Sequence, residues 1–143
     1  MDIMEMTEGE EEKSVGAFIV NSGGKFLLLY RADPVKSPWE PPKGHQEKGE
    51  ADGKTLRREL MEECGISDLE IEGGFREEVR FVNSKGSKRL VVMYLAKYNG
   101  AIKLSEEHRE YAWLSYEEAA ERLDYHGFPA ALEKAAKHLE SIG

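Results

Sequence analysis

The sequence contains a single cysteine, Cys64, among its 143 residues. One thiol excludes an internal disulfide, and a reducing cytoplasm is the natural compartment for such a chain. Long apolar runs are also absent: stretches such as 26–30 and 90–96 are far shorter than the roughly 20 residues that a membrane-spanning helix needs. The N-terminus is acidic and polar, without the basic start and apolar core of a signal peptide. We therefore expect a cytoplasmic protein without a membrane partner.

Basic residues are the minority among the charged ones. There are 20 lysines and arginines against 28 aspartates and glutamates, which gives a net charge of −8. Duplex nucleic acid is normally bound by a basic face, so it is not an expected partner. The acidity is partly concentrated near the N-terminus, where aromatic and β-branched residues are scarce. We expect residues 1–12 to be disordered and residues 13–143 to form a single domain.

Apolar periodicity and turn signals predict alternating strands and helices. Strands are expected over residues 14–21, 25–31, 73–83, 88–98 and 111–114, and helices over 51–64, 116–123 and 128–141. Ser115 and Glu118 have the spacing of a capping box at the start of the second helix. Pro41 and Pro42 interrupt both helices and strand ladders, so residues 38–49 are expected to form a loop.

The first helix carries Glu59, Glu62 and Glu63 at positions i, i+3 and i+4. Their carboxylates share one helix face, where like charges repel each other. A hard divalent cation such as Mg²⁺ removes this repulsion, because it prefers oxygen ligands. A solvated acidic surface is the alternative reading of such a cluster. An apolar stripe that includes Cys64 marks the buried side of the helix, and Gly65 is expected to end it.

The segment around these glutamates resembles the Nudix box. This pattern is Gly, five residues, Glu, seven residues, Arg-Glu, an aliphatic residue, any residue, Glu-Glu, any residue, Gly, and an aliphatic residue. Every required position is filled, by Gly44, Glu50, Arg58, Glu59, Leu60, Glu62, Glu63, Gly65 and Ile66. The resemblance implies an α/β fold, with a mixed sheet inside an α/β/α sandwich. It also implies a hydrolase of nucleoside diphosphate derivatives that uses Mg²⁺, for which Mn²⁺ can substitute.

The same resemblance implies roles for the residues of the box. The expected metal ligands are Glu59, Glu62, Glu63, Glu107 and the main chain at Gly44. One of the carboxylates takes the proton of the attacking water, and the sequence leaves open which one. Arg58 is expected to act in catalysis by orienting Glu59, while Glu50 holds the junction between the loop and the helix.

Three further segments are similar to the asymmetrical bis(5′-nucleosyl)-tetraphosphatases, Nudix enzymes that cut diadenosine tetraphosphate into ATP and AMP. They are residues 39–45 (Trp-Glu-Pro-Pro-Lys-Gly-His), residues 104–114 (Leu-Ser-Glu-Glu-His-Arg-Glu-Tyr-Ala-Trp-Leu), and the tail at 128–138. The similarity implies a small nucleotide substrate. Other Nudix substrates stay open as alternatives: ADP-ribose, nucleotide sugars, modified nucleoside triphosphates and capped RNA ends. So does a nucleotide-binding module without catalysis, and the chain is expected to be a monomer or a homodimer.

Seven residues are expected to bind the substrate. They are Lys43, Lys88 and Arg89 for the phosphates, His45 for a part of the substrate that stays open, and Tyr94, Tyr125 and Phe128 for the base. Each has an alternative, as a solvated surface charge or as a packed core ring. The tetraphosphatases commonly carry a tyrosine two residues before a Leu-Ala pair, where this chain has Met93. Tyr94 is one residue further along, which places it on the other face of a strand.

Overall fold

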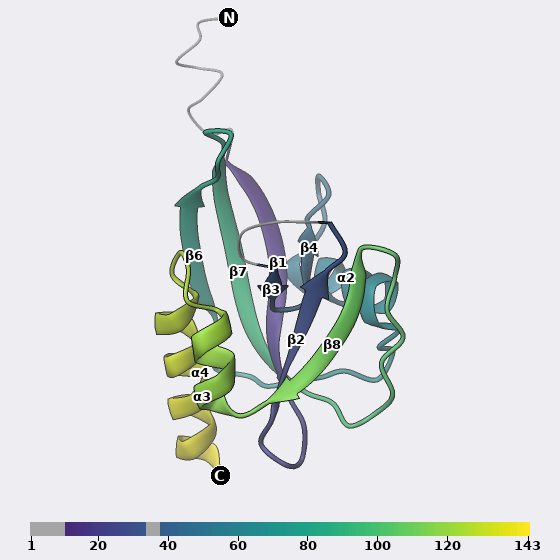
Figure 1. The fold of residues 1–143 in the computed structure, drawn as a ribbon, viewed down its shortest axis with the longest axis vertical. Coiled ribbons are helices and arrows are strands. Elements are labelled where there is room, and N and C mark those ends of the chain that lie inside the picture. Colours follow the sequence, from purple (N-terminus) through teal and green to yellow (C-terminus); the bar gives the residue numbers. More distant parts are fainter. Residues whose placement is uncertain (1–10, 34–37) are drawn as a thin grey trace, which may run out of the picture.

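The computed structural model describes residues 11–33 and 38–143, and its strands join one mixed sheet of eight strands (Figure 1). At its centre β1 (Glu12–Val20) pairs in parallel with β7 (Lys88–Lys97). Antiparallel pairs extend the sheet, from β1 to β2 (Phe26–Arg31) and β8 (His108–Leu114), and from β7 to β6 (Glu77–Val82). The mixed sheet predicted from the sequence is therefore confirmed.

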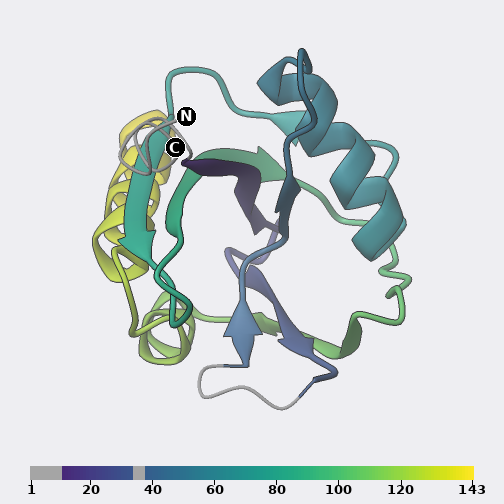
Figure 2. The same ribbon diagram turned by 90° about the horizontal axis from the view of Figure 1, so that it is seen from above.

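Helices cover the two sides of this sheet (Figure 2). The helix α2 (Asp52–Cys64) packs on one side, and α3 (Tyr116–Arg122) and α4 (Phe128–Ile142) pack on the other. Each side has its own apolar core, because alternate residues of β1 and β7 point in opposite directions. Val15, Ala17 and Ile19 face α2, whereas Phe18 and Val20 face the α3–α4 side. The α/β/α sandwich is confirmed.

The segment 38–49 differs from the expected loop, because it contains two short strands. β3 (Trp39–Glu40) pairs with β2, and β4 (Lys43–His45) pairs with β1. The two prolines lie between these strands, so neither interrupts a ladder. The loop prediction is wrong in this part, and the consequence is functional: residues 43–45 are fixed against the central strand. A further short strand, β5 (Glu70–Ile71), was also not expected.

The position of α2 is set by its sequence at both ends. Leu56, Leu60 and Cys64 are fully buried, and burial raises the pKa of the Cys64 thiol to about 12, so this thiol packs as an inert core group. Gly65 adopts φ 67° and donates to the carbonyl groups of the last turn. At the other end the Asp52 carboxylate accepts hydrogen bonds from side chains on three other segments, Lys13, Gln46 and Tyr94.

Other boundaries shift by a few residues. β8 begins at His108, three residues before the predicted start, and β6 is shorter than the predicted strand. The capping box of Ser115 and Glu118 is present. The expected disorder of residues 1–12 lies outside the described residues, except for its last two positions, and Glu12 already belongs to β1. Among the described residues, no helix combines the length and the apolar character that crossing a membrane requires.

Candidate active site

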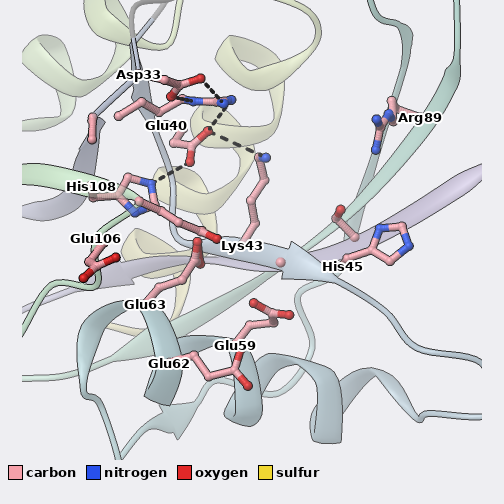
Figure 3. A pocket seen from close by; sticks show the side chains of 15 residues that line it. Asp33, Glu40, Lys43, His45, Glu59, Glu62, Glu63, Arg89, Glu106 and His108 are labelled. Atoms are coloured by element: carbon pink, nitrogen blue, oxygen red, sulfur yellow. Dashed lines mark hydrogen bonds and ion pairs between the residues drawn. The ribbon is translucent and has the colours of Figure 1, made fainter.

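A cleft of about 650 Å³ opens where β4, α2 and the start of β8 meet. In Figure 3, Glu59, Glu62 and Glu63 rise from α2 on one side of it. Glu40 and His108 lie at one end of the view, and His45 and Arg89 lie at the other. Segments that are far apart in the sequence therefore bring acidic and basic side chains into one cavity.

The three glutamates of α2 differ in their exposure. The Glu62 side chain is 60% exposed, whereas Glu63 is only 6% exposed. Burial, and then the nearby charges of Glu40 and Glu59, raise the pKa of Glu63 to about 8. Its Oε2 atom has no hydrogen-bond partner among the described residues. A buried carboxyl group without a partner is destabilising unless a cation or a proton compensates its charge, so these residues fit a divalent metal ion.

Gly44 lies directly against Glu59. A Cβ atom added at Gly44 would come within 2.0 Å of the Glu59 carboxylate, so any other residue here would require the Glu59 side chain to move. The main chain of β4 thereby approaches the carboxylates of α2, as expected for a main-chain contribution at Gly44. Burial raises the pKa of Glu59, although the hydrogen bond from Arg58 acts in the opposite direction.

Arg58 lies behind this site and donates hydrogen bonds to four acceptor atoms of three residues. Its guanidinium donates to both oxygens of Glu50 at 2.8 Å, to Glu59 at 2.7 Å and to the main-chain carbonyl of His45 at 3.0 Å. The hydrogen bonds from Arg58 are the main reason that the pKa of Glu50 falls to about 2. Thr55, a buried residue of α2, donates a further hydrogen bond to Glu50. Arg58 is therefore placed to orient Glu59 and to hold the junction of loop and helix.

Glu107 reaches the cleft from the segment before β8. Main-chain hydrogen bonds hold this segment on two sides. Ser105 N–H donates to the Glu63 carbonyl of α2, and Ala32 N–H, directly after β2, donates to the Glu107 carbonyl. Glu107 lines the same cavity as Glu59 and Glu63, and its charge contributes to the raised pKa of both. All the carboxylates expected as ligands thus border one cavity.

Glu40 and His108 are among the cleft residues that were not singled out from the sequence. The Glu40 carboxylate lies 2.7 Å from Nε2 of His108 and within 4 Å of charged nitrogens of Lys43 and Arg31. Burial alone would raise the pKa of Glu40, but the His108 hydrogen bond and the positive charge of Lys43 lower it. Both residues lie within the segments 39–45 and 104–114. A signal was therefore present, but it did not show that the two side chains meet.

The polar residues expected to bind the substrate separate into two groups. Lys43, His45 and Arg89 line the cleft. Lys88 is exposed and does not line the cleft, because successive side chains of a strand point to opposite faces. The structure therefore does not bring Lys88 to the cleft, and its phosphate-binding role stays a prediction. Arg89 also forms an ion pair with Glu12 of the neighbouring strand.

The aromatic residues expected at the base do not present open faces to the cleft. Tyr94 lies on the α2 side of the sheet and donates to Asp52 at 2.6 Å. Phe128 is 1% exposed within the other core, as the packing alternative requires. The Tyr125 hydroxyl donates to the Trp39 carbonyl at 2.5 Å, and the ring packs edge-on against Phe128. None of these residues lines the cleft, and Met93 is fully buried.

A different aromatic pair lies nearby. Phe81 of β6 and His126 of the α3–α4 loop stack with ring centroids 3.7 Å apart and planes within 9°. Phe81 is the register partner of Arg89. The pKa of His126 is lowered by burial and then by the positive charge of Lys43, which lines the cleft. Neither ring of the pair is itself among the lining residues, so the pair is linked to the cleft through its neighbours Arg89 and Lys43. The sequence did not predict either residue, because their contact joins two distant segments of the chain.

Comparisons with known proteins agree with this arrangement. A family model described as "NUDIX domain" matches residues 11–134. The asymmetrical bis(5′-nucleosyl)-tetraphosphatase of Mus musculus is 40% identical over 124 residues, which are 83% of each chain. The enzyme of the same name from Sus scrofa is 37% identical over 127 residues, 85% of each chain. The crystal structure of a C. elegans Ap4A hydrolase binary complex aligns with a TM-score of 0.83 and 31% identity, covering 91% of this chain and 98% of that chain.

Proposed function

This chain belongs to the Nudix hydrolase family, and we propose that it cleaves diadenosine tetraphosphate to ATP and AMP. The observation that carries the proposal is the cleft itself. It places the carboxylates of α2 opposite Lys43 and Arg89, so that a metal-bound polyphosphate has basic partners along its length. The named relatives supply the substrate class, since they cover most of this chain at 37% to 40% identity.

Nudix hydrolases generally use a divalent metal ion, and we propose Mg²⁺ here, with Mn²⁺ able to substitute. Its ligands would come from Glu59, Glu62, Glu63, Glu107 and the main chain at Gly44. When bound, the ion neutralises charge on the phosphates and lowers the pKa of the attacking water. The protein supplies the rest. Arg58 keeps Glu59 oriented, and one of the cleft carboxylates accepts the proton of the water.

Lys43, His45 and Arg89 are proposed to hold the phosphate chain, because they line the cleft. The base is proposed to stack on the pair formed by Phe81 and His126. Stacking on an aromatic ring contributes about 1–3 kcal/mol per base. The two rings already touch each other, so the base stacks on an outer face of the pair or separates the rings on binding.

The remaining sequence-based expectations form part of the same proposal. We propose a cytoplasmic location, which suits the one buried, free cysteine. A small nucleotide is the proposed partner, without duplex nucleic acid, and the protein is proposed to act as a monomer or homodimer. One domain over residues 13–143 is supported by β1 and α4, which lie near the two ends of that range and contribute to the same apolar core.

The test is a panel of dinucleoside polyphosphates, ADP-ribose, nucleotide sugars and capped RNA, with the products resolved by anion-exchange chromatography. We expect diadenosine tetraphosphate to be the preferred substrate and ATP with AMP to be its products. In ¹⁸O-labelled water, only one of the two products should carry the label at each turnover. Two ADP molecules as main products would contradict the asymmetrical assignment. Preference for another compound of the panel would keep the Nudix chemistry and replace the substrate.

A further inference from the structure

Glu40, Glu63 and His108 form a compact set of donor groups at one end of the cleft. They come from β3, α2 and β8, and one ligand atom of each lies within 4.8 Å of the others. In Figure 3, Glu63 points up from its helix toward the end of the cleft where Glu40 and His108 lie. This set differs chemically from the group of carboxylates expected to bind Mg²⁺, because it includes an imidazole nitrogen.

The burial of this set is unusual for ionisable groups. Glu63 and His108 are 6% and 5% exposed, and the Glu40 side chain is 12% exposed. Buried ionisable groups are normally paired or bound to metal. Glu40 and His108 bond to each other, but Oε2 of Glu63 is buried and has no partner among the described residues. The Glu63 carboxylate therefore needs a positively charged partner, and the His108 nitrogen lies beside it in the same set.

We propose that Glu40, Glu63 and His108 form a second cation position, which takes a divalent transition-metal ion such as Zn²⁺ in preference to Mg²⁺. Imidazole with carboxylate suits Zn²⁺, whereas Mg²⁺ favours all-oxygen sites. Three protein ligands leave one coordination position open, as zinc sites that bind water or substrate do. Because the set lines the cleft, that open position faces the cavity in which the substrate is proposed to bind.

Binding at this position changes the partners of Glu40 and of His108. Coordination through Nε2 of His108 moves the ring proton to Nδ1 and replaces the Glu40–His108 hydrogen bond with a shared cation. Lys43 and Arg31, which now lie 3.8 and 3.9 Å from Glu40, become available for anionic groups. Lys43 is one of the proposed phosphate contacts, and an ion bound to Glu40 would leave the Lys43 ammonium group free to pair with a phosphate.

This inference rests on the proposed function only through Glu63, which the two cation positions share. The experiment therefore measures the metal ion directly and without substrate. Metal-stripped protein is titrated with Zn²⁺ by calorimetry in saturating Mg²⁺, and with Co²⁺ by visible absorption. Pulsed EPR of bound Mn²⁺ then shows whether a nitrogen atom is coordinated. We expect about one equivalent of Zn²⁺ that Mg²⁺ does not displace, and a directly coordinated nitrogen.

The variants His108→Asn and Glu40→Gln should each weaken Zn²⁺ binding at least tenfold, and His108→Asn should remove the nitrogen signal. Glu40→Gln keeps the shape of the side chain, so it tests the site even if His108→Asn unfolds. Two control variants remove imidazoles that are not in the set: His45→Asn in the same cleft, and His138→Asn, whose ring packs against Phe75. Both variants should bind Zn²⁺ with the affinity of the parent protein. All-oxygen coordination, or nitrogen coordination that is lost in His45→Asn, would overturn the inference. Nitrogen-ligated Zn²⁺ in a protein that hydrolyses no nucleotide would instead contradict the proposed function alone.

Discussion

The two walls of the cleft are built in opposite ways. Apart from Glu107, the metal-facing wall comes from one continuous stretch, residues 44–63, in which Arg58 joins Glu50, Glu59 and the His45 carbonyl. The wall proposed to meet the base is assembled from β6, β7 and the α3–α4 loop, where Phe81 meets Arg89 and His126. Contacts within one loop and helix follow from local spacing, but contacts between distant strands depend on register. Single substitutions in the metal-facing wall should therefore reduce activity strongly, and substitutions in the wall proposed to meet the base should have smaller effects.

The largest effect is expected from Glu63→Gln. The substitution keeps the size of the side chain and removes the charge that a metal ligand needs, so turnover should fall by orders of magnitude while the fold persists. Steady-state kinetics at saturating Mg²⁺ and circular dichroism measure the two properties. Glu72→Gln is the control, because Glu72 pairs with Lys97 and does not line the cleft. Comparable turnover in Glu63→Gln would remove α2 from the metal site.

Gly44→Ala should follow, with a loss of turnover of about a hundredfold. The added methyl would overlap the Glu59 carboxylate, and a small displacement of a reacting group can reduce the rate by that factor. The matched control is Gly53→Ala in α2, where a Cβ atom meets nothing within 4 Å. Alanine should stabilise that helix by roughly 0.5–1 kcal/mol. If the two variants turned over equally, the main chain at Gly44 would have no part in the site.

Mg²⁺ binding should depend on pH through Glu63. Because the pKa of this carboxyl lies at about 8 without metal, binding below that pH must displace a proton. Affinity should therefore rise by up to about tenfold per pH unit between pH 6 and 8, and then level off. Calorimetry in buffers of different ionisation enthalpy counts the protons released. Binding that released no proton at pH 6.5 would show that Glu63 is already ionised.

The same shift has a consequence for stability, with a defined sign. A carboxyl whose pKa is raised by folding stabilises the protein below its ordinary value of 4.5, and this contribution is lost as the pH rises through about 8. The free energy of unfolding of the metal-free protein should decrease over that range by at most about 5 kcal/mol, at roughly 1.4 kcal/mol per pKa unit. Glu63→Gln should lack this decrease, which urea unfolding at several pH values would measure.

Substitutions in the base wall should have smaller effects. Phe81→Ala and His126→Ala each remove one ring of the stack, and KM for diadenosine tetraphosphate should rise roughly tenfold, as expected for the loss of about 1.4 kcal/mol of stacking. Turnover at saturation should change little. Tyr125→Phe is the control, since it removes only the hydroxyl that bonds to Trp39 and should lower stability by about 1 kcal/mol. An unchanged KM in both alanine variants would move base recognition elsewhere.

The same contrast explains how much the sequence could predict. The carboxylates of α2, the role of Gly65 and the capping box at Ser115 depend on positions within one or two turns, and each was found. Tyr125 was expected to bind the base, whereas its hydroxyl bonds to the main chain of Trp39, 86 residues earlier in the chain. The meeting of Glu40 with His108 likewise spans 68 residues. No local pattern predicts contacts over such separations. Glu40 meets His108 because β3 and β8 both pair with β2.

The smallest effect is expected at Lys88, and it tests the register of β7 directly. Arg89 lines the cleft and Lys88 does not, although the two residues are adjacent and both basic. Lys88→Ala should leave KM within twofold of the parent and the free energy of unfolding within about 0.5 kcal/mol, as for most exposed substitutions. Arg89→Ala should raise KM, and the increase should shrink at high salt because the interaction is with phosphate. The reverse pattern, with Lys88 raising KM and Arg89 silent, would mean that β7 is shifted by one residue and would exchange every residue assigned to its two faces.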